Sequence, residues 1–269
     1  MAGRAKTYRY IETSEGVVRV SAVKDIMYAM EKLAPQKLAD TDDNVGLLIG
    51  REDAKVERIL VSLDADIFAI REAIEQNVDL IVCHHPVIFN PIKNITQTKL
   101  LDLIENKIAV FVAHTNVDWV DGGINDVLAE KFGLCDVRPL KVSDNGAKWG
   151  RAGNIEPMSL GELVKKVNNT LGGDIKYVGD KERIVSKVAL CGGGGGFLMP
   201  AEGYDVYISA DFRYHESIAA ETQGICLIDA GHFEMENVIV EVLANYLKKE
   251  YNDIAVIASA RKNSQFKYE

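Results

Sequence analysis

The chain has 269 residues, of which 47% are hydrophobic and 26% are charged, and its formal net charge is -9. This is the composition of an ordinary soluble globular protein, long enough for one large domain or two lobes. The acidic balance, without any long basic cluster, disfavours nucleic acid as the main partner. No apolar run approaches the roughly 20 residues of a membrane span, and the N-terminus lacks the apolar core of a signal peptide. We therefore expect a cytoplasmic protein.

The first half of the chain alternates between strand-like and helix-like segments. Residues 22–34 have helical periodicity, and a polar loop follows them. Apolar runs predict strands at 58–63, 78–83 and 108–113, and the periodicity between and after them predicts helices at 65–76, 98–106 and 123–132. Because these strands are apolar on both faces, they are typical of a parallel or mixed sheet covered by helices. In such sheets, sites gather at the loops after the carboxyl ends of strands.

The middle of the chain differs in character from both ends. It contains a predicted helix at 159–170, short strands near 174–178 and 184–190, and a run of five glycines. The tail returns to the earlier pattern with a strand at 224–229, a long helix at 233–249 and a last strand at 253–258. We interpret the chain as a two-lobed α/β protein. Residues 1–140 and 222–269 form a discontinuous main lobe that binds metal, and residues 141–221 form a smaller inserted α+β lobe.

Four scattered cysteines, none at a CxxC spacing, are typical of reduced thiols and not of a disulfide frame; they are Cys83, Cys135, Cys191 and Cys226. Cys83 adjoins His84 and could be a metal ligand. Since a free cysteine behaves as a small hydrophobic residue, we interpret Cys83 as the last inward-facing residue of its strand.

A pair of histidines, His84-His85, directly follows the predicted strand 78–83, and Pro86 ends that strand. Adjacent side chains on an extended chain point in opposite directions. The two imidazoles can therefore each serve one ion of a two-metal site, provided that the backbone turns at Pro86. The alternative is two polar loop residues with no metal.

A second polar cluster follows the predicted strand 108–113. Asp118 is a candidate oxygen ligand, and His114 could bind metal or orient another ligand. The alternative for the acids is that Asp118 or Asp121 caps the next helix, a role that Asp121 fits better. Because both clusters follow strands of one predicted sheet, we expect them at the same sheet edge.

A third cluster opens the last long helix, where His232 and Glu236 are four residues apart and so share one helix face. Imidazole and carboxylate suit a divalent metal, and a carboxylate can bridge two ions. The alternative is a surface pair at a helix start, where the helix dipole favours an acid. Glu234 lies on another face. The three clusters together offer three histidines and two acids for two metal ions, which could activate a bridging water.

Two weaker signals remain. The backbone amides of Gly192–Gly196 could cradle a phosphate, although a flexible connection explains the glycines equally well. Asp211 and His215 flank a predicted helix start and, with His114, are our candidates for acid–base or substrate-contacting groups.

Four stretches of the sequence resemble the signature segments of the NIF-three-like family, whose members are often called GTP cyclohydrolase type-two homologues. They are DNVGLLIG (43–50), DLIVCHHPVIF (79–89), AHTNVDWVDGGINDVLAE (113–130) and DAGHFEMENVIVEVL (229–243). They occur in the expected order and spacing. The middle of the chain matches more loosely. Asp42 departs from the family pattern, since an aromatic residue commonly stands there.

The resemblance implies a two-lobed fold with a dinuclear metal centre, ring-shaped homohexamers and metal sites that face an internal cavity. The family's ligand positions fall on His84, His85, Asp118, His232 and Glu236, with Glu236 in the bridging position. The metals would be zinc, iron, manganese or nickel, since mixed nitrogen and oxygen ligands admit all four. The family name implies hydrolytic opening of a purine ring.

The leading hypothesis is therefore a metal-dependent hydrolase of a small molecule, with a nucleotide as one candidate substrate. The first alternative is a non-catalytic metal-binding regulatory or interaction protein. A third class, nucleic-acid binding inside a ring, is kept only because an oligomer can hide a basic cavity, and the charge of -9 counts against it.

Overall fold

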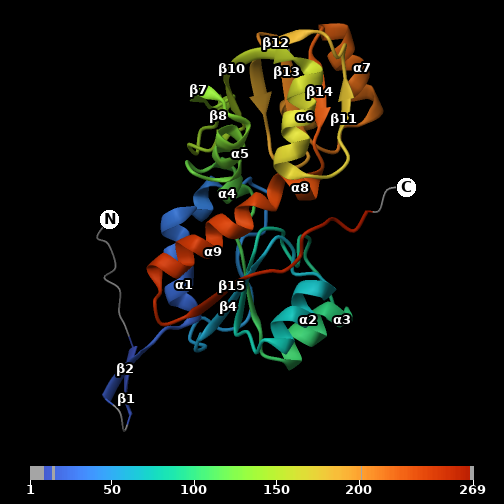
Figure 1. Ribbon diagram of the computed structural model, residues 1–269. Coiled ribbons are helices and arrows are strands. Elements are labelled where there is room, and N and C mark those ends of the chain that lie inside the picture. Colours follow the sequence, from blue (N-terminus) through green and yellow to red (C-terminus); the bar gives the residue numbers. More distant parts are fainter. Residues whose placement is uncertain (1–8, 14–15, 201, 267–269) are drawn as a thin grey trace. The chain divides into compact units, whose positions relative to one another are not determined.

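The computed structural model describes residues 9–13, 16–200 and 202–266. The chain forms two compact units (Figure 1). Unit 1 comprises the residues up to Asn116 together with Val240–Arg261, and unit 2 comprises Val117–Ile239 with the residues from Lys262 onward. The sequence had assigned 117–140 and 222–239 to the first lobe. The structure groups them with the middle of the chain because strands in these segments pair with strands there, and hydrophobic periodicity does not reveal strand partners.

Unit 1 contains a five-stranded mixed sheet in the order β15-β4-β5-β6-β3. Its strands are β3 (Gly46–Ile49), β4 (Arg58–Ser62), β5 (Leu80–Cys83), β6 (Ala109–Val112) and β15 (Ala255–Ala258). The four from β15 to β6 are parallel, and β3 is antiparallel to β6. The carboxyl ends of β4, β5 and β6 therefore lie at one sheet edge, as the sequence predicted. Their loops begin with Leu63, His84 and Ala113.

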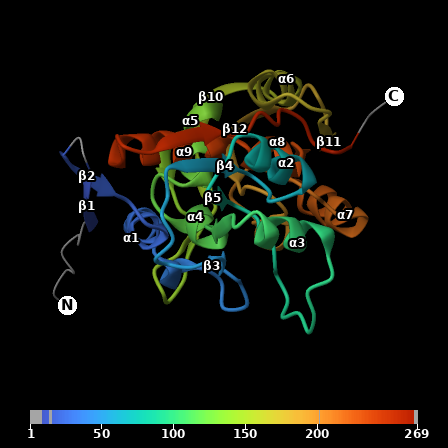
Figure 2. The same cartoon turned by 90° about the horizontal axis from the view of Figure 1, so that it is seen from below.

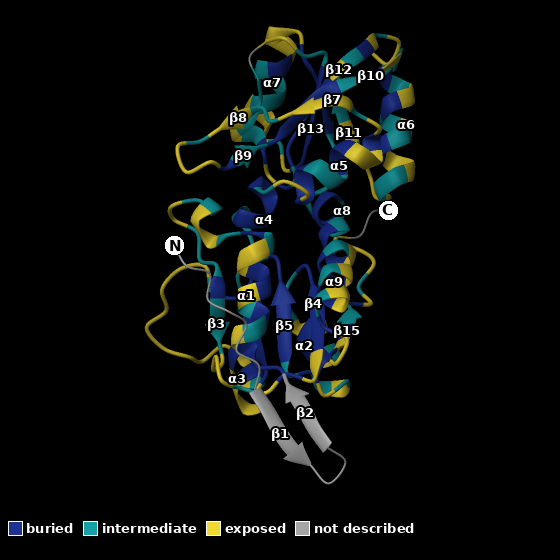
Figure 3. Cartoon of the chain, turned by 90° about the vertical axis from the view of Figure 1, so that its left-hand side faces the viewer, coloured by how far each residue is buried: buried dark blue, intermediate teal, exposed yellow. Residues whose placement is uncertain are grey.

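Helices cover both faces of this sheet (Figures 1 and 2). One face carries α1 (Val23–Leu33) and α9 (Val238–Glu250), which are tied together where the Tyr246 hydroxyl donates to the Ala29 carbonyl at 2.9 Å. The other face carries α2 (Ile67–Glu75) and α3 (Thr98–Glu105). The helices bury their apolar stripes against central strands such as β5, which is buried along its whole length (Figure 3). The predicted mixed sheet covered by helices is confirmed.

Three smaller elements complete unit 1. A short 3-10 helix, η1, spans Gln36–Leu38. The strands β1 (Arg9–Thr13) and β2 (Gly16–Val20) pair antiparallel in a region that the sequence left unassigned.

Unit 2 contains a six-stranded mixed sheet in the order β11-β14-β13-β12-β10-β7. Its strands are β7 (Cys135–Arg138), β10 (Arg151–Ser159), β11 (Lys176–Val178), β12 (Ile184–Leu190), β13 (Val206–Ser209) and β14 (Cys226–Asp229). Strands β12, β13 and β14 are parallel, whereas β11, β10 and β7 each pair antiparallel with their neighbours. A separate two-stranded sheet joins β8 (Lys141–Val142) and β9 (Lys148–Trp149).

The helices of unit 2 position its functional loops. They are α4 (Thr115–Trp119, which begins in unit 1), α5 (Ile124–Phe132), α6 (Leu160–Leu171), α7 (Tyr214–Gln223) and α8 (His232–Glu236), with the 3-10 helix η2 (Gly196–Leu198). Helix α6 begins with a capping box between Ser159 and Glu162. The single helix predicted at 233–249 is divided at Asn237 into α8 and α9. Among the described residues, no helix is long and apolar enough to cross a membrane.

Candidate metal centre

The loop after β5 in unit 1 brings His84 and His85 together, with their ring centroids 4.9 Å apart. His84 is fully buried, and its Nδ1 lies 2.9 Å from the carbonyl oxygen of Ala113. Because a carbonyl oxygen only accepts, Nδ1 of His84 carries the proton and Nε2 is left as the basic nitrogen. The backbone bends at His84 and His85, whereas the sequence suggested a turn at Pro86.

The second histidine of the pair is oriented by an acid from the loop after β4. Nδ1 of His85 lies 2.8 Å from Oδ1 of Asp64. This contact fixes the ring and leaves Nε2 for a ligand, which is the usual arrangement around metal-binding histidines. Asp64 was not singled out from the sequence, although its place directly after a predicted strand was a usable signal.

A third histidine, His114, joins this pair from the loop after β6. The ligand nitrogens of His84, His85 and His114 all lie within 4.8 Å of one another. Nδ1 of His114 lies 2.8 Å from Oδ1 of Asp43, and the other Asp43 oxygen accepts from the backbone amide and the hydroxyl of Thr115. Unit 1 by itself therefore assembles three imidazoles, two of them oriented by carboxylates.

The environment of Asp43 keeps its carboxylate charged. Burial alone would raise the pKa of Asp43, but the hydrogen bonds and charge of His114 and the hydrogen bonds from Thr115 outweigh it and lower the pKa to about 2. Asp43 is the first residue of the DNVG segment, so the sequence contained it without indicating its role.

The α8 helix of unit 2 presents His232 and Glu236 on one face, as predicted. Nε2 of His232 lies 2.9 Å from Oε2 of Glu236, and Nδ1 lies 2.7 Å from Oδ2 of Asp211. Burial alone would lower the pKa of His232, but these two carboxylates outweigh it and raise the pKa to about 9. Glu236 is buried, whereas Glu234 on the same helix is only partly buried and lies against the backbone of Gly231.

A second carboxylate of unit 2, Asp118, lies in α4 and is also buried. One of its oxygens lies within 4.8 Å of an oxygen of Glu236. Its backbone carbonyl accepts from the side-chain amide of Asn125 at 2.9 Å, which ties α4 to α5. Two buried carboxylates at this separation repel each other, and a cation bound by both would remove the repulsion. The predicted alternative of helix capping is not what Asp118 does, because the N-cap residue of α5 is Gly123 and no side chain caps this helix.

The backbone of the glycine run lies close to the side chains of Glu236 and His232. A Cβ on Gly193 would lie 2.0 Å from Oε1 of Glu236 and 3.2 Å from Nε2 of His232, and its φ is +63°. Only glycine can adopt this left-handed φ without strain and also leave room for the Glu236 carboxylate. The Gly193 carbonyl accepts from the amide of Ala210 and the hydroxyl of Ser209, each at 2.9 Å. The loop is thus an ordered wall beside the carboxylate and not a flexible connection.

The same loop is poorly suited to phosphate. Besides Gly193, the backbones of Gly194 and Gly196 also lie against carboxylates, those of Asp211 and Glu216. The amides of Gly192 and Gly195 donate to the side chains of Asn125 and Ser209. An anion at this loop would therefore meet negative charge, and two of the amides already have acceptors.

The remaining predicted residues have simpler roles. His215 is exposed on α7, where its ring contacts Tyr214 at a centroid distance of 5.5 Å. Asp121 pairs with Lys148 at 2.5 Å instead of capping α5. Cys83 is the last residue of β5 and is fully buried, as the sequence suggested, and burial raises the pKa of its thiol. A buried thiol of this kind packs as a small apolar side chain.

The donor sets of the two units fit divalent transition metals. Unit 1 supplies imidazole nitrogens, and unit 2 supplies one imidazole and two buried carboxylates. Zinc, iron, manganese and nickel all accept such mixed ligands. The described side chains can therefore hold a metal ion, and their number and kind leave its identity open.

Comparison with known proteins gives a consistent result. The model of the Duf34/NIF3 (NGG1p interacting factor 3) family matches residues 21–264. The GTP cyclohydrolase 1 type 2 homolog of Lactococcus lactis is 34% identical over 256 residues, covering 91% of this chain and 98% of that protein. The structure of reduced HcgD from Methanocaldococcus jannaschii is 31% identical with a TM-score of 0.78, over 90% of this chain and 99% of that one. A Bacillus cereus protein related to NIF3 shares the fold, with a TM-score of 0.87 at 23% identity over 93% and 99% of the two chains.

Proposed function

Because the chain belongs to the Duf34/NIF3 family, we propose that it binds two divalent metal ions and uses them to hydrolyse a small molecule. The proposed ligands are His84, His85, Asp118, His232 and Glu236. A nucleotide is the proposed substrate class, in keeping with the name of the Lactococcus relative. His114 is proposed as a proton-transferring group beside the ligands and not as a ligand.

The observation that carries the proposal is the environment of Glu236. Its carboxylate is buried, contacts His232, lies within 4.8 Å of a second buried carboxylate on Asp118 and packs against a glycine that has no space for a side chain. Burying two carboxylates is costly unless cations compensate them. The resemblance to the family implies the bridging position for Glu236, and its two carboxylate oxygens would suit that role.

Neighbouring groups would orient the proposed ligands for metal binding. The Ala113 carbonyl and Asp64 hold His84 and His85 with Nε2 as the donor atom, while Asp211 holds the ring of His232. Bound divalent ions supply the Lewis acidity that lowers the pKa of water.

The Asp43–His114 pair would supply proton transfer. Asp43 accepts from Nδ1 of His114 and thereby directs the basic Nε2 away from itself. A histidine held in this way can take a proton from water or give one to a leaving group. Ring opening of a purine nucleotide and hydrolysis of a phosphoester can both use such a group.

Metal analysis tests the ligand assignment directly. Wild-type protein should contain about two divalent ions per chain after reconstitution at neutral pH. Glu236→Ala should lose both, while Glu234→Ala should retain both because Glu234 lies on another face of α8. A wild-type chain that binds no metal, or equal loss in the two variants, would refute the assignment.

Activity is tested separately with a panel of nucleotides and phosphoesters. We expect metal-loaded wild type to hydrolyse at least one of them, and His84→Ala to have lost that activity. Full metal content with no hydrolysis of any member would overturn the enzyme proposal and favour the non-catalytic alternative.

We also propose that the chain assembles into the homohexamer implied by its family. Light scattering after size-exclusion chromatography should then give six times the chain mass of 29.7 kDa. A monomer or dimer at micromolar concentration would contradict this.

A further inference from the structure

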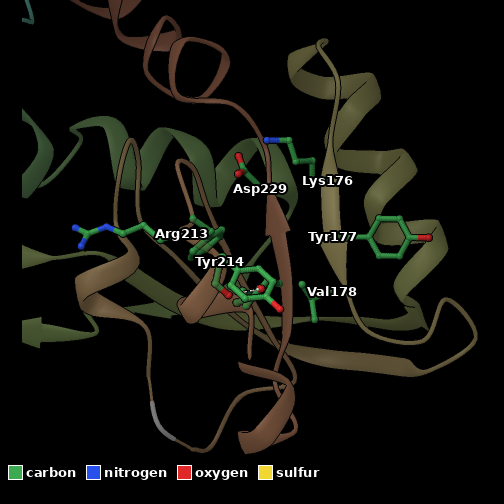
Figure 4. A pocket seen from close by; sticks show the side chains of 9 residues that line it. Lys176, Tyr177, Val178, Arg213, Tyr214 and Asp229 are labelled. Atoms are coloured by element: carbon green, nitrogen blue, oxygen red, sulfur yellow. Dashed lines mark hydrogen bonds between the residues drawn. The ribbon is translucent and has the colours of Figure 1, made fainter. Parts of the chain in front are cut away.

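Unit 2 contains a pocket of about 190 Å³ where β11 pairs with β14 at the edge of the sheet (Figure 4). Pockets that enclose a whole drug-sized ligand are larger, roughly 300–1,000 Å³. This pocket can therefore hold one ring system but not a complete nucleotide.

The strand register defines the floor of the pocket. Lys176 is the partner of Asp229, and Val178 is the partner of Leu227. Because side chains alternate along a strand, these four lie on one face of the β11–β14 ladder. Tyr177 belongs to the other face, and Figure 4 shows its ring pointing away from Asp229. The floor is thus apolar at one end and charged at the other.

The walls of the pocket come from the loop after β13 and from α7. They include the rings of Phe212 and Tyr214. Phe212 packs edge-on against the buried Tyr207, with ring centroids 5.9 Å apart. Tyr214 is 75% exposed, so its ring offers an open surface. Aromatic walls around a small apolar floor are suited to a planar ring.

The charged end of the floor offers a donor beside an acceptor. In the described part of the chain, Lys176 and Asp229 form no ion pair with each other, although they are register partners. Among the residues that the structure describes, the Asp229 carboxylate accepts one hydrogen bond, a long one of 3.4 Å from the amide of Gly231. The ammonium group and the carboxylate are therefore both able to contact a ligand.

The pocket shares its loops with the metal ligands of unit 2. Phe212 directly follows Asp211, which contacts His232, and Asp229 precedes His232 by three residues. Both loops follow the carboxyl ends of the parallel strands β13 and β14, where ligands of open α/β sheets bind. Short segments of chain therefore connect the pocket with the Asp211–His232 contact.

We propose that this pocket binds a planar heterocycle with a lactam edge, of which guanine is the biological example. The ring carbonyl would accept from Lys176, and the neighbouring N–H groups would donate to the two oxygens of Asp229. The ring would stack against Tyr214 and Phe212. Identifying the heterocycle as part of the substrate rests on the proposed function, whereas binding itself does not.

Ligand-observed NMR titration tests the proposal on the full chain, with and without a chelator. The probes are guanosine and 1-methylguanosine, which lacks the N1–H donor. We expect wild type to bind guanosine and to bind 1-methylguanosine about tenfold more weakly, the effect of one lost hydrogen bond to a charged group. Lys176→Met and Asp229→Asn should each weaken guanosine binding about tenfold. Asp229→Asn should also reduce the discrimination between the probes.

The control is Lys165→Met, which removes an exposed lysine on α6, outside the pocket, and should leave binding unchanged. Circular dichroism verifies folding, and Lys176, being exposed, can be replaced without disturbing the core. Absence of guanosine binding to wild type, or equal binding by all variants, overturns the proposal. The wild type could also bind guanosine through Lys176 and Asp229 and yet bind no metal and hydrolyse no substrate. That result would support the proposed pocket and refute only the proposed function.

Discussion

The backbone of Gly193 lies so close to Glu236 that a Cβ at this glycine would stand 2.0 Å from Oε1 of the carboxylate. Gly193→Ala must therefore displace Glu236 or the loop itself. It must also place alanine at a φ of +63°, which costs about 1–2 kcal/mol. We expect lower thermal stability and the loss of at least one bound metal ion, measured by calorimetry and elemental analysis.

Gly194→Ala is the matched control for this substitution. A Cβ there would lie 3.7 Å from Asp211, which is ordinary van der Waals contact, and the position has no left-handed φ. This variant should keep wild-type metal content. If both alanine variants lost metal equally, general stiffening of the loop and not contact with Glu236 would be the cause.

The raised pKa of His232 predicts how the metal-free protein responds to pH. Its pKa is about 9 in the folded chain against 6.5 ordinarily, so the folded state holds this proton more tightly than the unfolded state. The resulting stabilisation is complete below about pH 6.5 and is lost as the pH rises through about 9. Urea unfolding of chelator-treated protein should show the free energy of unfolding falling across this interval.

Replacement of His232 tests whether this residue causes the fall in stability at high pH. His232→Asn should lack that part of the decline, whereas His215→Asn, at an exposed position on α7, should retain it. If His232 is a ligand as proposed, metal must also displace its proton, so metal affinity of the wild type should rise with pH up to about 9. A decline of the same size in His232→Asn would mean that other groups cause it.

The lowered pKa of Asp43 predicts the opposite pH dependence of stability: the free energy of unfolding should fall as the solution becomes more acidic. Its pKa is lowered from 3.8 to about 2, so its stabilisation is present above pH 3.8 and is lost as the pH falls through about 2. Asp43→Asn should reduce the free energy of unfolding by about 2 kcal/mol at neutral pH. The difference in the free energy of unfolding between wild type and variant, measured by urea unfolding, should become smaller between pH 4 and pH 2. A gap that is independent of pH would show that packing, not charge, makes Asp43 important.

The sequence predicted the elements of unit 1 well because its strands are apolar runs bounded by polar loops. The strand predicted at 58–63 is observed at Arg58–Ser62, and the helix predicted at 98–106 at Thr98–Glu105. The division of the chain into two units was harder to predict from the sequence. It depends on which strands pair, such as β7 with β10, and such pairings between distant segments leave no periodicity in the sequence.

The proposed ligands were easier to recognise in the sequence than the residues that orient their side chains. A histidine after a strand or a His/Glu pair four apart on a helix is visible as a pattern. Asp64 and Asp43 act through contacts 21 and 71 residues away in the chain, with His85 and His114. A lone aspartate in a loop does not show which distant ring it will meet.

The contact between Asp64 and His85 gives the last prediction. Asp64→Ala removes the acceptor for Nδ1, so the ring is free to rotate or to change tautomer and present the wrong nitrogen to the metal. Metal affinity should fall about 10–100-fold, as is typical when such a partner is lost, and competition with a chromogenic chelator measures it. Asp64→Asn keeps one acceptor oxygen and should recover most of the affinity. Asp53→Ala, at an exposed position, is the control. Wild-type affinity in Asp64→Ala would show that His85 is held by its backbone alone.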